Sequence, residues 1–134
     1  MDNKQNGKVH ILVIDDDKEL IESLKEFLDV RGFDVASAYD GKSGIEIARR
    51  DKPDLIILDI TMPDMDGRDV LIEIKKDDDI KDIPVIVLTG MEDQFSRNHV
   101  MELGAYEYLT KPYDSYTLLR QINNVINKKD IGEL

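Results

Sequence analysis

Apolar residues follow two alternating patterns along this chain. Residues 9–14 and 85–88 are almost continuously apolar and rich in β-branched side chains, which is typical of strands buried on both faces of a parallel sheet. Between such runs the period changes, because Leu20, Leu24 and Leu28 recur every four positions, as on one buried stripe of a helix. The pattern therefore predicts short buried strands that alternate with amphipathic helices.

The same alternation continues along the chain and predicts an α/β fold. Asp17 is a candidate N-cap for the first helix, and Gly32 is a candidate stop signal after it. Crossovers of this length join parallel strands as right-handed βαβ units, so we expect one doubly wound, five-stranded parallel sheet with five helices on its two faces. The predicted strands lie near residues 9–14, 34–38, 54–58, 84–88 and 105–109, and the predicted helices near residues 18–31, 42–50, 68–76, 93–103 and 115–127.

The length of 134 residues allows one domain of ordinary size. We place this domain at residues 8–127 and expect flexible ends at residues 1–7 and 128–134, which are polar. No apolar run approaches the roughly 20 residues of a membrane-spanning helix, so we expect a cytoplasmic protein that does not bind membranes. The net charge of −11 opposes direct binding to nucleic acid or anionic lipid, and the absence of cysteine excludes thiolate chemistry.

Four acidic residues directly follow two of the predicted strands. Asp15, Asp16 and Asp17 come after the first strand, and Asp59 comes after the third. In the strand order 2-1-3-4-5, ligands bind between strands 1 and 3, at the carboxyl ends of the strands. Carboxylates gathered there repel one another unless a cation is present, and oxygen ligands favour Mg²⁺. Capping of the first helix is the simpler explanation for Asp17, but it does not account for Asp15 and Asp16.

A hydroxyl and an amine follow the last two strands at the same edge. Thr89 comes after the fourth strand, and Lys111 comes after the fifth. Together they can neutralise and hydrogen-bond the oxygens of a phosphoryl group, whose transfer depends mainly on positioning and charge stabilisation. A carboxylate such as Asp59 can accept that group covalently. The sequence therefore predicts a magnesium site that binds and accepts a phosphoryl group.

The combination of these motifs resembles a known family. Asp15-Asp16, the stretch over residues 59–67, Thr89-Gly90 and Lys111-Pro112 occur in the order and context of the receiver domain of two-component response regulators. The resemblance spans about residues 8–127. The chemotaxis response regulator is a member of this family. The resemblance implies a flavodoxin-like fold with the strand order 2-1-3-4-5.

The resemblance also implies roles for the acidic residues. Asp59 would accept a phosphoryl group from a phosphohistidine of a sensor histidine kinase or a histidine phosphotransfer protein. Asp16, Asp59 and the backbone carbonyl of Thr61 would bind Mg²⁺, for which Mn²⁺ can substitute, and Asp15 would act through a bound water. The protein would be a phosphorylation-controlled switch that turns over no free metabolite.

Further residues would bind the phosphoryl group and transmit its presence. By the same resemblance, Lys111, Thr89 and the backbone amide of Gly90 would hold the phosphoryl oxygens, and Pro112 would follow a cis peptide bond. Tyr108 would turn inward and reshape the face formed by the fourth helix, fifth strand and fifth helix. This face would control a protein partner or an output domain outside the chain, and we expect a monomer, with dimerisation on phosphorylation left open.

Specific positions of the sequence conflict with other functions that this fold can carry. A haloacid-dehalogenase-type phosphatase also uses an aspartate nucleophile, but it expects a second carboxylate where Thr61 stands. A flavin-binding protein of the same fold needs a phosphate loop where Asp15, Asp16 and Asp17 would repel the phosphate. A module that has lost its phosphate chemistry is disfavoured because Asp59 and the other motif residues are present. Thr61 and Met91 occupy positions that tune the phosphoryl lifetime in receivers, so that lifetime stays open.

A calcium-binding loop is a further alternative for residues 62–73. Asp64, Asp66, Gly67 and Glu73 match four positions of the EF-hand pattern, but its first ligand position is Met62, which offers no oxygen. The match therefore fails. We interpret the segment as a turn over the acidic pocket, with an unusual backbone angle at Gly67.

Overall fold

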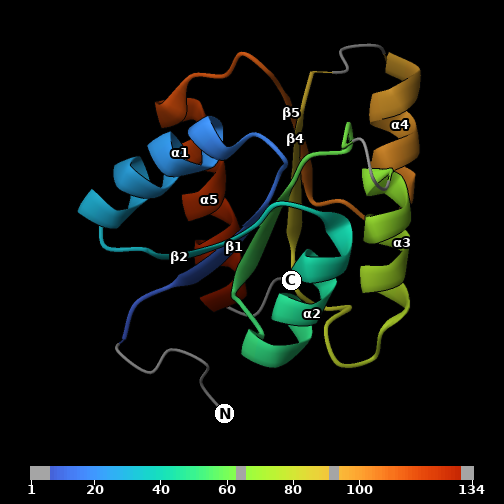
Figure 1. The fold of residues 1–134 in the computed structure, drawn as a ribbon, viewed down its shortest axis with the longest axis horizontal. Helices are drawn as coiled ribbons and strands as arrows, with labels where there is room; N and C mark the ends of the chain where they lie inside the picture. The colour runs from blue at the N-terminus through green and yellow to red at the C-terminus, as the bar shows by residue number, and fades with distance from the viewer. Residues whose placement is uncertain (1–6, 63–65, 91–93, 131–134) are drawn as a thin grey trace.

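The protein folds as one five-stranded parallel sheet with helices on both faces (Figure 1). The computed structural model describes residues 7–62, 66–90 and 94–130. The strand order is β2-β1-β3-β4-β5, as predicted, with every neighbouring pair parallel. The elements are β1 (His10–Ile14), α1 (Lys18–Val30), β2 (Asp34–Ala38), α2 (Gly41–Asp51), β3 (Leu55–Leu58), α3 (Gly67–Lys76), β4 (Val85–Thr89), α4 (Gln94–Glu102), β5 (Glu107–Thr110) and α5 (Ser115–Asp130).

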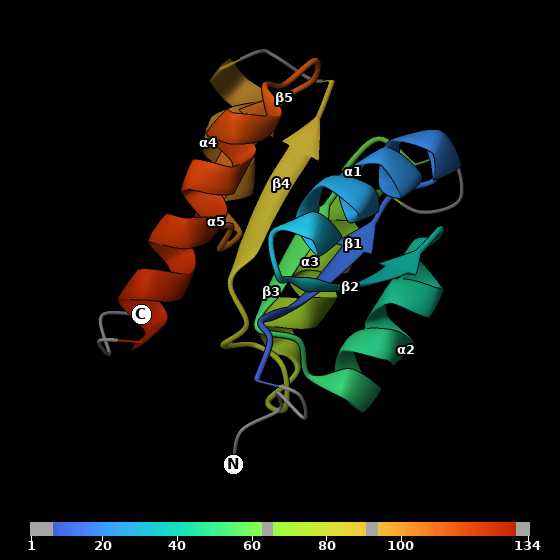
Figure 2. The same ribbon diagram turned by 90° about the vertical axis from the view of Figure 1, so that its left-hand side faces the viewer.

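Two hydrophobic cores lie on opposite faces of the sheet, and the alternation of side chains along each strand supplies both. In β1, Ile11 and Val13 join the core beneath α1 and α5, whereas Leu12 and Ile14 join the core beneath α2, α3 and α4. Figure 1 shows α1 and α5 on one side of the sheet and the other three helices on the opposite side, and Figure 2 shows the same layers after a quarter turn. Because both faces are covered, the central strands need apolar residues at every position.

Helix α1 is flanked by the two residues that the sequence predicted to bound it. The Asp17 carboxylate accepts a hydrogen bond of 3.1 Å from the Leu20 amide and caps α1. Gly32 follows the helix with a φ of +91°, a conformation that glycine adopts without steric penalty. Both sequence predictions are confirmed.

The ends of some elements differ from the predicted ones. β3 begins at Leu55, one residue later than predicted, and the Asp54 carboxylate just before it accepts a hydrogen bond of 2.9 Å from the His10 amide. α5 continues to Asp130, three residues beyond the predicted end of this helix. Met91, Asp64 and residues 1–6 and 131–134 lie outside the described residues. Within the described ranges, no helix is long and apolar enough to cross a membrane.

Candidate functional site

Three carboxylates meet where the strand order reverses. Asp15 and Asp59 follow the paired ends of β1 and β3, where Ile14 lies in register with Leu58, and both acidic side chains are buried. Asp16 is exposed at the rim of the same edge. One carboxylate oxygen from each of these three residues lies within 4.8 Å of the other two. This is the cluster that the sequence predicted, and a set of carboxylate oxygens fits a hard cation such as Mg²⁺.

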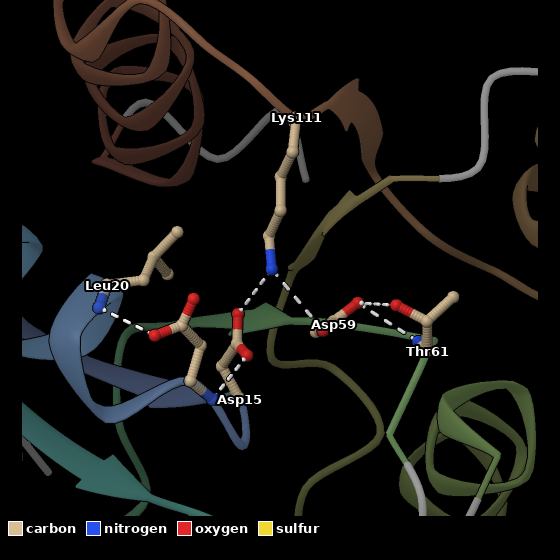
Figure 3. Close-up of polar contacts among 6 residues, drawn as sticks. Asp15, Leu20, Asp59, Thr61 and Lys111 are labelled. Carbon is tan, nitrogen blue, oxygen red and sulfur yellow. Dashed lines mark hydrogen bonds and ion pairs between the residues drawn. The ribbon is translucent and has the colours of Figure 1, made fainter.

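Lys111 extends from the end of β5 into this cluster (Figure 3). Its ammonium nitrogen lies 2.9 Å from Asp15 Oδ2 and 3.4 Å from Asp59 Oδ2. The Lys111 amide donates a hydrogen bond of 2.7 Å to the Thr89 carbonyl, which fixes the end of β5 against β4. The peptide bond between Lys111 and Pro112 is cis, as the resemblance implied. Lys111 therefore supplies the one positive charge that contacts both buried carboxylates in the described part of the chain.

The pKa values of this group reflect the balance between burial and pairing. Burial raises the pKa of the Asp15 carboxyl, the Asp59 charge adds to this, and hydrogen bonds from Lys111 and the Asp17 amide offset only part of it. Burial alone would lower the pKa of the Lys111 ammonium, but its interactions with Asp15 and Asp59 outweigh that effect and raise the pKa. The site therefore favours the charged form of Lys111, and its Asp15 carboxyl group ionises less readily than usual.

Asp59 is oriented by the loop that follows it. The amide and the hydroxyl of Thr61 both donate hydrogen bonds to Asp59 Oδ1, at 3.0 Å and 2.9 Å. Asp59 Oδ2 instead faces Lys111 (Figure 3). The sequence prediction gave Thr61 a role for its backbone carbonyl and for the phosphoryl lifetime. It did not include the hydroxyl contact, which a hydroxyl residue two positions after an acidic one makes possible.

Gly67 fits closely against the backbone of the same loop. Its amide donates a hydrogen bond of 3.1 Å to the Ile60 carbonyl, and a Cβ atom at position 67 would overlap the Ile60 Cα and the Asp59 carbonyl oxygen. Its φ angle is not positive. The expected unusual backbone angle is therefore wrong, and close approach between backbones is the physical reason for glycine here.

Thr89 and Tyr108 lie beside the site in buried positions. The Thr89 side chain is fully buried, and its hydroxyl has no hydrogen-bond partner among the described residues. Gly90 follows it and is exposed. The Tyr108 side chain, one strand further out, is also buried. A buried hydroxyl without a partner is uncommon in native proteins and frequently marks a position that binds something else.

The fold and the acidic site are those of a phosphoryl-accepting signalling domain, and comparison with known families identifies the family. Residues 11–123 match the family model described as "Response regulator receiver domain". The chain belongs to this family of receiver domains, which act as signalling switches in two-component systems. The family binds Mg²⁺ at an acidic pocket, and the carboxylate cluster of this chain fits such an ion.

Individual relatives agree with this assignment. The chain is 36% identical over 116 residues to Protein PilH of Pseudomonas aeruginosa, and the aligned region covers 87% of this chain and 96% of PilH. It is 38% identical over 123 residues to the probable transcriptional regulator ycf27 of Porphyridium aerugineum, and this aligned region covers 92% of the chain and 50% of ycf27. The chain thus spans about half the length of ycf27 and of several other curated relatives, such as the response regulator MprA.

Solved structures show the same likeness in three dimensions. A response regulator receiver domain from Clostridium thermocellum is 37% identical, with a TM-score of 0.84, and the match covers 92% of this chain and 98% of that one. The chemotaxis protein CheY4 of Vibrio cholerae is 26% identical with a TM-score of 0.84, over 89% of this chain and 99% of CheY4. These findings support the receiver family over the phosphatase and flavin-binding alternatives.

Proposed function

We propose that Asp59 is the residue that accepts the phosphoryl group in this receiver domain. The observation that carries the proposal is the position of Asp59, which is buried at the switch point of the sheet, close to the Asp15 and Asp16 carboxylates and to the Lys111 ammonium. In the transfer, a bond forms between an Asp59 carboxylate oxygen and phosphorus while the bond between phosphorus and a donor imidazole nitrogen breaks. The electron pair of the broken bond stays on that nitrogen.

The acidic cluster would hold the metal ion that this chemistry requires. Asp16, Asp59 and the backbone carbonyl of Thr61 would bind Mg²⁺ directly, and Asp15 would contact it through a water molecule. Mn²⁺ has the same preference for oxygen ligands and can take its place. When bound, the ion would neutralise charge on the phosphoryl oxygens.

The remaining side chains would stabilise the phosphoryl group and respond to it. Lys111 already lies between Asp15 and Asp59, so its ammonium can pair with a phosphoryl oxygen after a small shift. The Thr89 hydroxyl, which has no hydrogen-bond partner within the described ranges, and the amide of the exposed Gly90 would hydrogen-bond the other oxygens. Movement of Thr89 toward the group would favour the inward position of Tyr108 and so change the face formed by α4, β5 and α5.

Response regulator relatives imply a histidine kinase as the donor and an output partner as the target. For this chain we propose a sensor histidine kinase or a histidine phosphotransfer protein as the donor, in the cytoplasm. The domain would comprise residues 8–127 and would catalyse only its own phosphorylation and dephosphorylation. Its output would pass through a protein partner or a further domain and not through direct contact with DNA, because the net charge of −11 repels a phosphate backbone.

The test is phosphorylation by a small donor. The protein is incubated with Mg²⁺ and acetyl phosphate and then examined by intact mass spectrometry. We expect one added phosphoryl group in the wild type and in Asp69→Asn, whose exposed carboxylate lies on α3, and none in Asp59→Asn. Modification that persists in Asp59→Asn would place the acceptor elsewhere.

A further inference from the structure

β5 is the end strand of the sheet, and one of its residues directs its backbone groups away from β4. The Lys111 amide donates across to Thr89 of β4. Backbone groups of successive residues in a strand point alternately to opposite sides. The Tyr108 N–H and C=O bond to side chains and not to β4, and no sixth strand follows β5 among the described elements.

Two side chains bond the backbone groups that a neighbouring strand would otherwise bond. Glu107 Oε1 accepts a hydrogen bond of 2.9 Å from the Tyr108 amide. Arg97, from α4, donates through Nη1 to the Tyr108 carbonyl at 3.2 Å and through Nη2 to the same Glu107 oxygen at 3.3 Å. The three contacts form a closed ring made of the Glu107 carboxylate, the Arg97 guanidinium, and the backbone N–H and C=O of Tyr108. A planar guanidinium is suited to this arrangement because it offers two donors in a fixed geometry.

The ring adds polar contacts to the apolar packing of α4 against the sheet. Among its side chains in the described set, only Ser96 and Val100 are buried, and Met101 is more than a third exposed. Arg97 also lies over the Tyr108 ring, with the guanidinium carbon 5.7 Å from the ring centroid. One arginine thus connects α4 to the backbone, the ring and the neighbouring acid of the edge strand.

We propose that Arg97 and Glu107 form a latch that occupies the backbone groups of Tyr108 at the edge of β5 and holds α4 and the buried Tyr108 in one arrangement. While the latch is closed, α4 cannot move away from β5 without breaking the hydrogen bonds from Arg97 to the Tyr108 carbonyl and to Glu107. When it opens, α4 loses both hydrogen bonds from Arg97 to β5. The latch is thus a conformational device of the α4 and β5 region, and it does not depend on whether Asp59 is the phosphorylation site.

The latch can be tested by amide hydrogen exchange, measured residue by residue with NMR. The variants are Arg97→Met, which keeps the side-chain length and helix propensity but removes the donors, Glu107→Val, which keeps strand propensity but removes the acceptor, and the double variant. Arg49→Met is the matched control, because Arg49 joins α2 to Asp77 through a similar exposed ion pair. Glu107→Gln tests the charge alone, since its amide oxygen can still accept.

We expect each single latch variant to speed exchange of the amides of residues 98–102 at least fivefold, with amides of β1 and β3 unchanged. The double variant should exchange no more than about twofold faster than the faster single variant, because either change opens the same latch. Glu107→Gln should show a smaller increase, and Arg49→Met none in α4. Unchanged α4 exchange in Arg97→Met, or single effects that multiply fully in the double variant, would overturn the proposal.

Discussion

Lys111 lies closer to Asp15 than to Asp59, with its ammonium nitrogen 2.9 Å from an oxygen of the first and 3.4 Å from an oxygen of the second. The lysine is therefore shared between the proposed phosphoryl acceptor and a neighbouring acid. Two buried carboxylates around one ammonium leave the site with an excess of negative charge. That excess is available to attract a cation, and its consequences for stability can be measured.

Mg²⁺ should stabilise the folded protein. A ligand that binds only the native state at about 100 times its dissociation constant adds about 2.7 kcal/mol to the free energy of unfolding, so the melting temperature should rise by several degrees. NaCl at equal ionic strength should have less effect, because it only screens the carboxylates. Differential scanning calorimetry of the wild type and of Asp16→Ala tests this expectation. A magnesium effect that is equal in the two proteins would argue against Asp16 as a ligand.

Asp15→Asn should raise the stability of the metal-free protein at neutral pH. Burial, the larger effect, and the Asp59 charge raise the pKa of Asp15 in the folded state above its ordinary value of 3.8. The folded protein therefore holds this proton more tightly than the unfolded chain, so stability is lost as the pH rises from 3.8 through the raised folded pKa. Asparagine carries no charge and avoids this loss.

The pH dependence provides the measurement for the Asp15 prediction. The difference in melting temperature between Asp15→Asn and the wild type should be positive at pH 7 and should shrink toward pH 4, with a chelator present throughout. Asp17→Asn is a suitable control, since Asp17 caps α1 outside the buried pair. A difference that stays constant with pH would show that ionisation of Asp15 is not its cause.

Thr89→Val should stabilise the protein and impair its response to phosphoryl groups. The hydroxyl of Thr89 is buried and has no hydrogen-bond partner in the described part of the chain, and an unsatisfied buried polar group costs about 1–3 kcal/mol. Valine has the same shape and no hydroxyl, so denaturant unfolding should show an increase within that range. Binding of the phosphoryl mimic beryllofluoride should weaken at least tenfold. Thr110→Val, at a partly exposed position of β5, should change neither quantity as much.

Gly67→Ala should destabilise the protein and slow phosphorylation. The added methyl group would meet the Ile60 backbone and the Asp59 carbonyl, which cannot move aside as a flexible side chain can. Overpacking of this kind costs about 1–3 kcal/mol and would shift the loop that carries Thr61. Gly90→Ala, whose Cβ would meet nothing within 4 Å, is the steric control for unfolding measurements. Equal stability of the two variants would contradict the close packing at Gly67.

Much of the site could be predicted because it depends on strand order and on positions at strand ends. Once β1 and β3 are neighbours, residues directly after them must lie close together, which brings Asp15 to Asp59. The same reasoning brings Lys111 to that edge from β5. The α1 cap at Asp17 was predictable because it needs only local geometry.

The details that the sequence did not reveal depend on distances between elements. The close fit of Gly67 against Ile60 is a matter of tenths of an ångström, and no residue pattern records it. The contact between Arg97 and Glu107 joins residues ten positions apart, and it requires the distance between α4 and β5 to be known. The extension of α5 to Asp130 lies in a polar segment, where no apolar periodicity indicates a helix.

The closed edge at Tyr108 also bears on how the protein behaves in concentrated solution. An end strand with unpaired N–H and C=O groups is a template onto which another polypeptide can add as a new strand, and such addition leads to aggregation. At Tyr108 these groups are already bonded to Glu107 and Arg97. The same two side chains that hold α4 therefore also help to keep neighbouring molecules from joining their sheets.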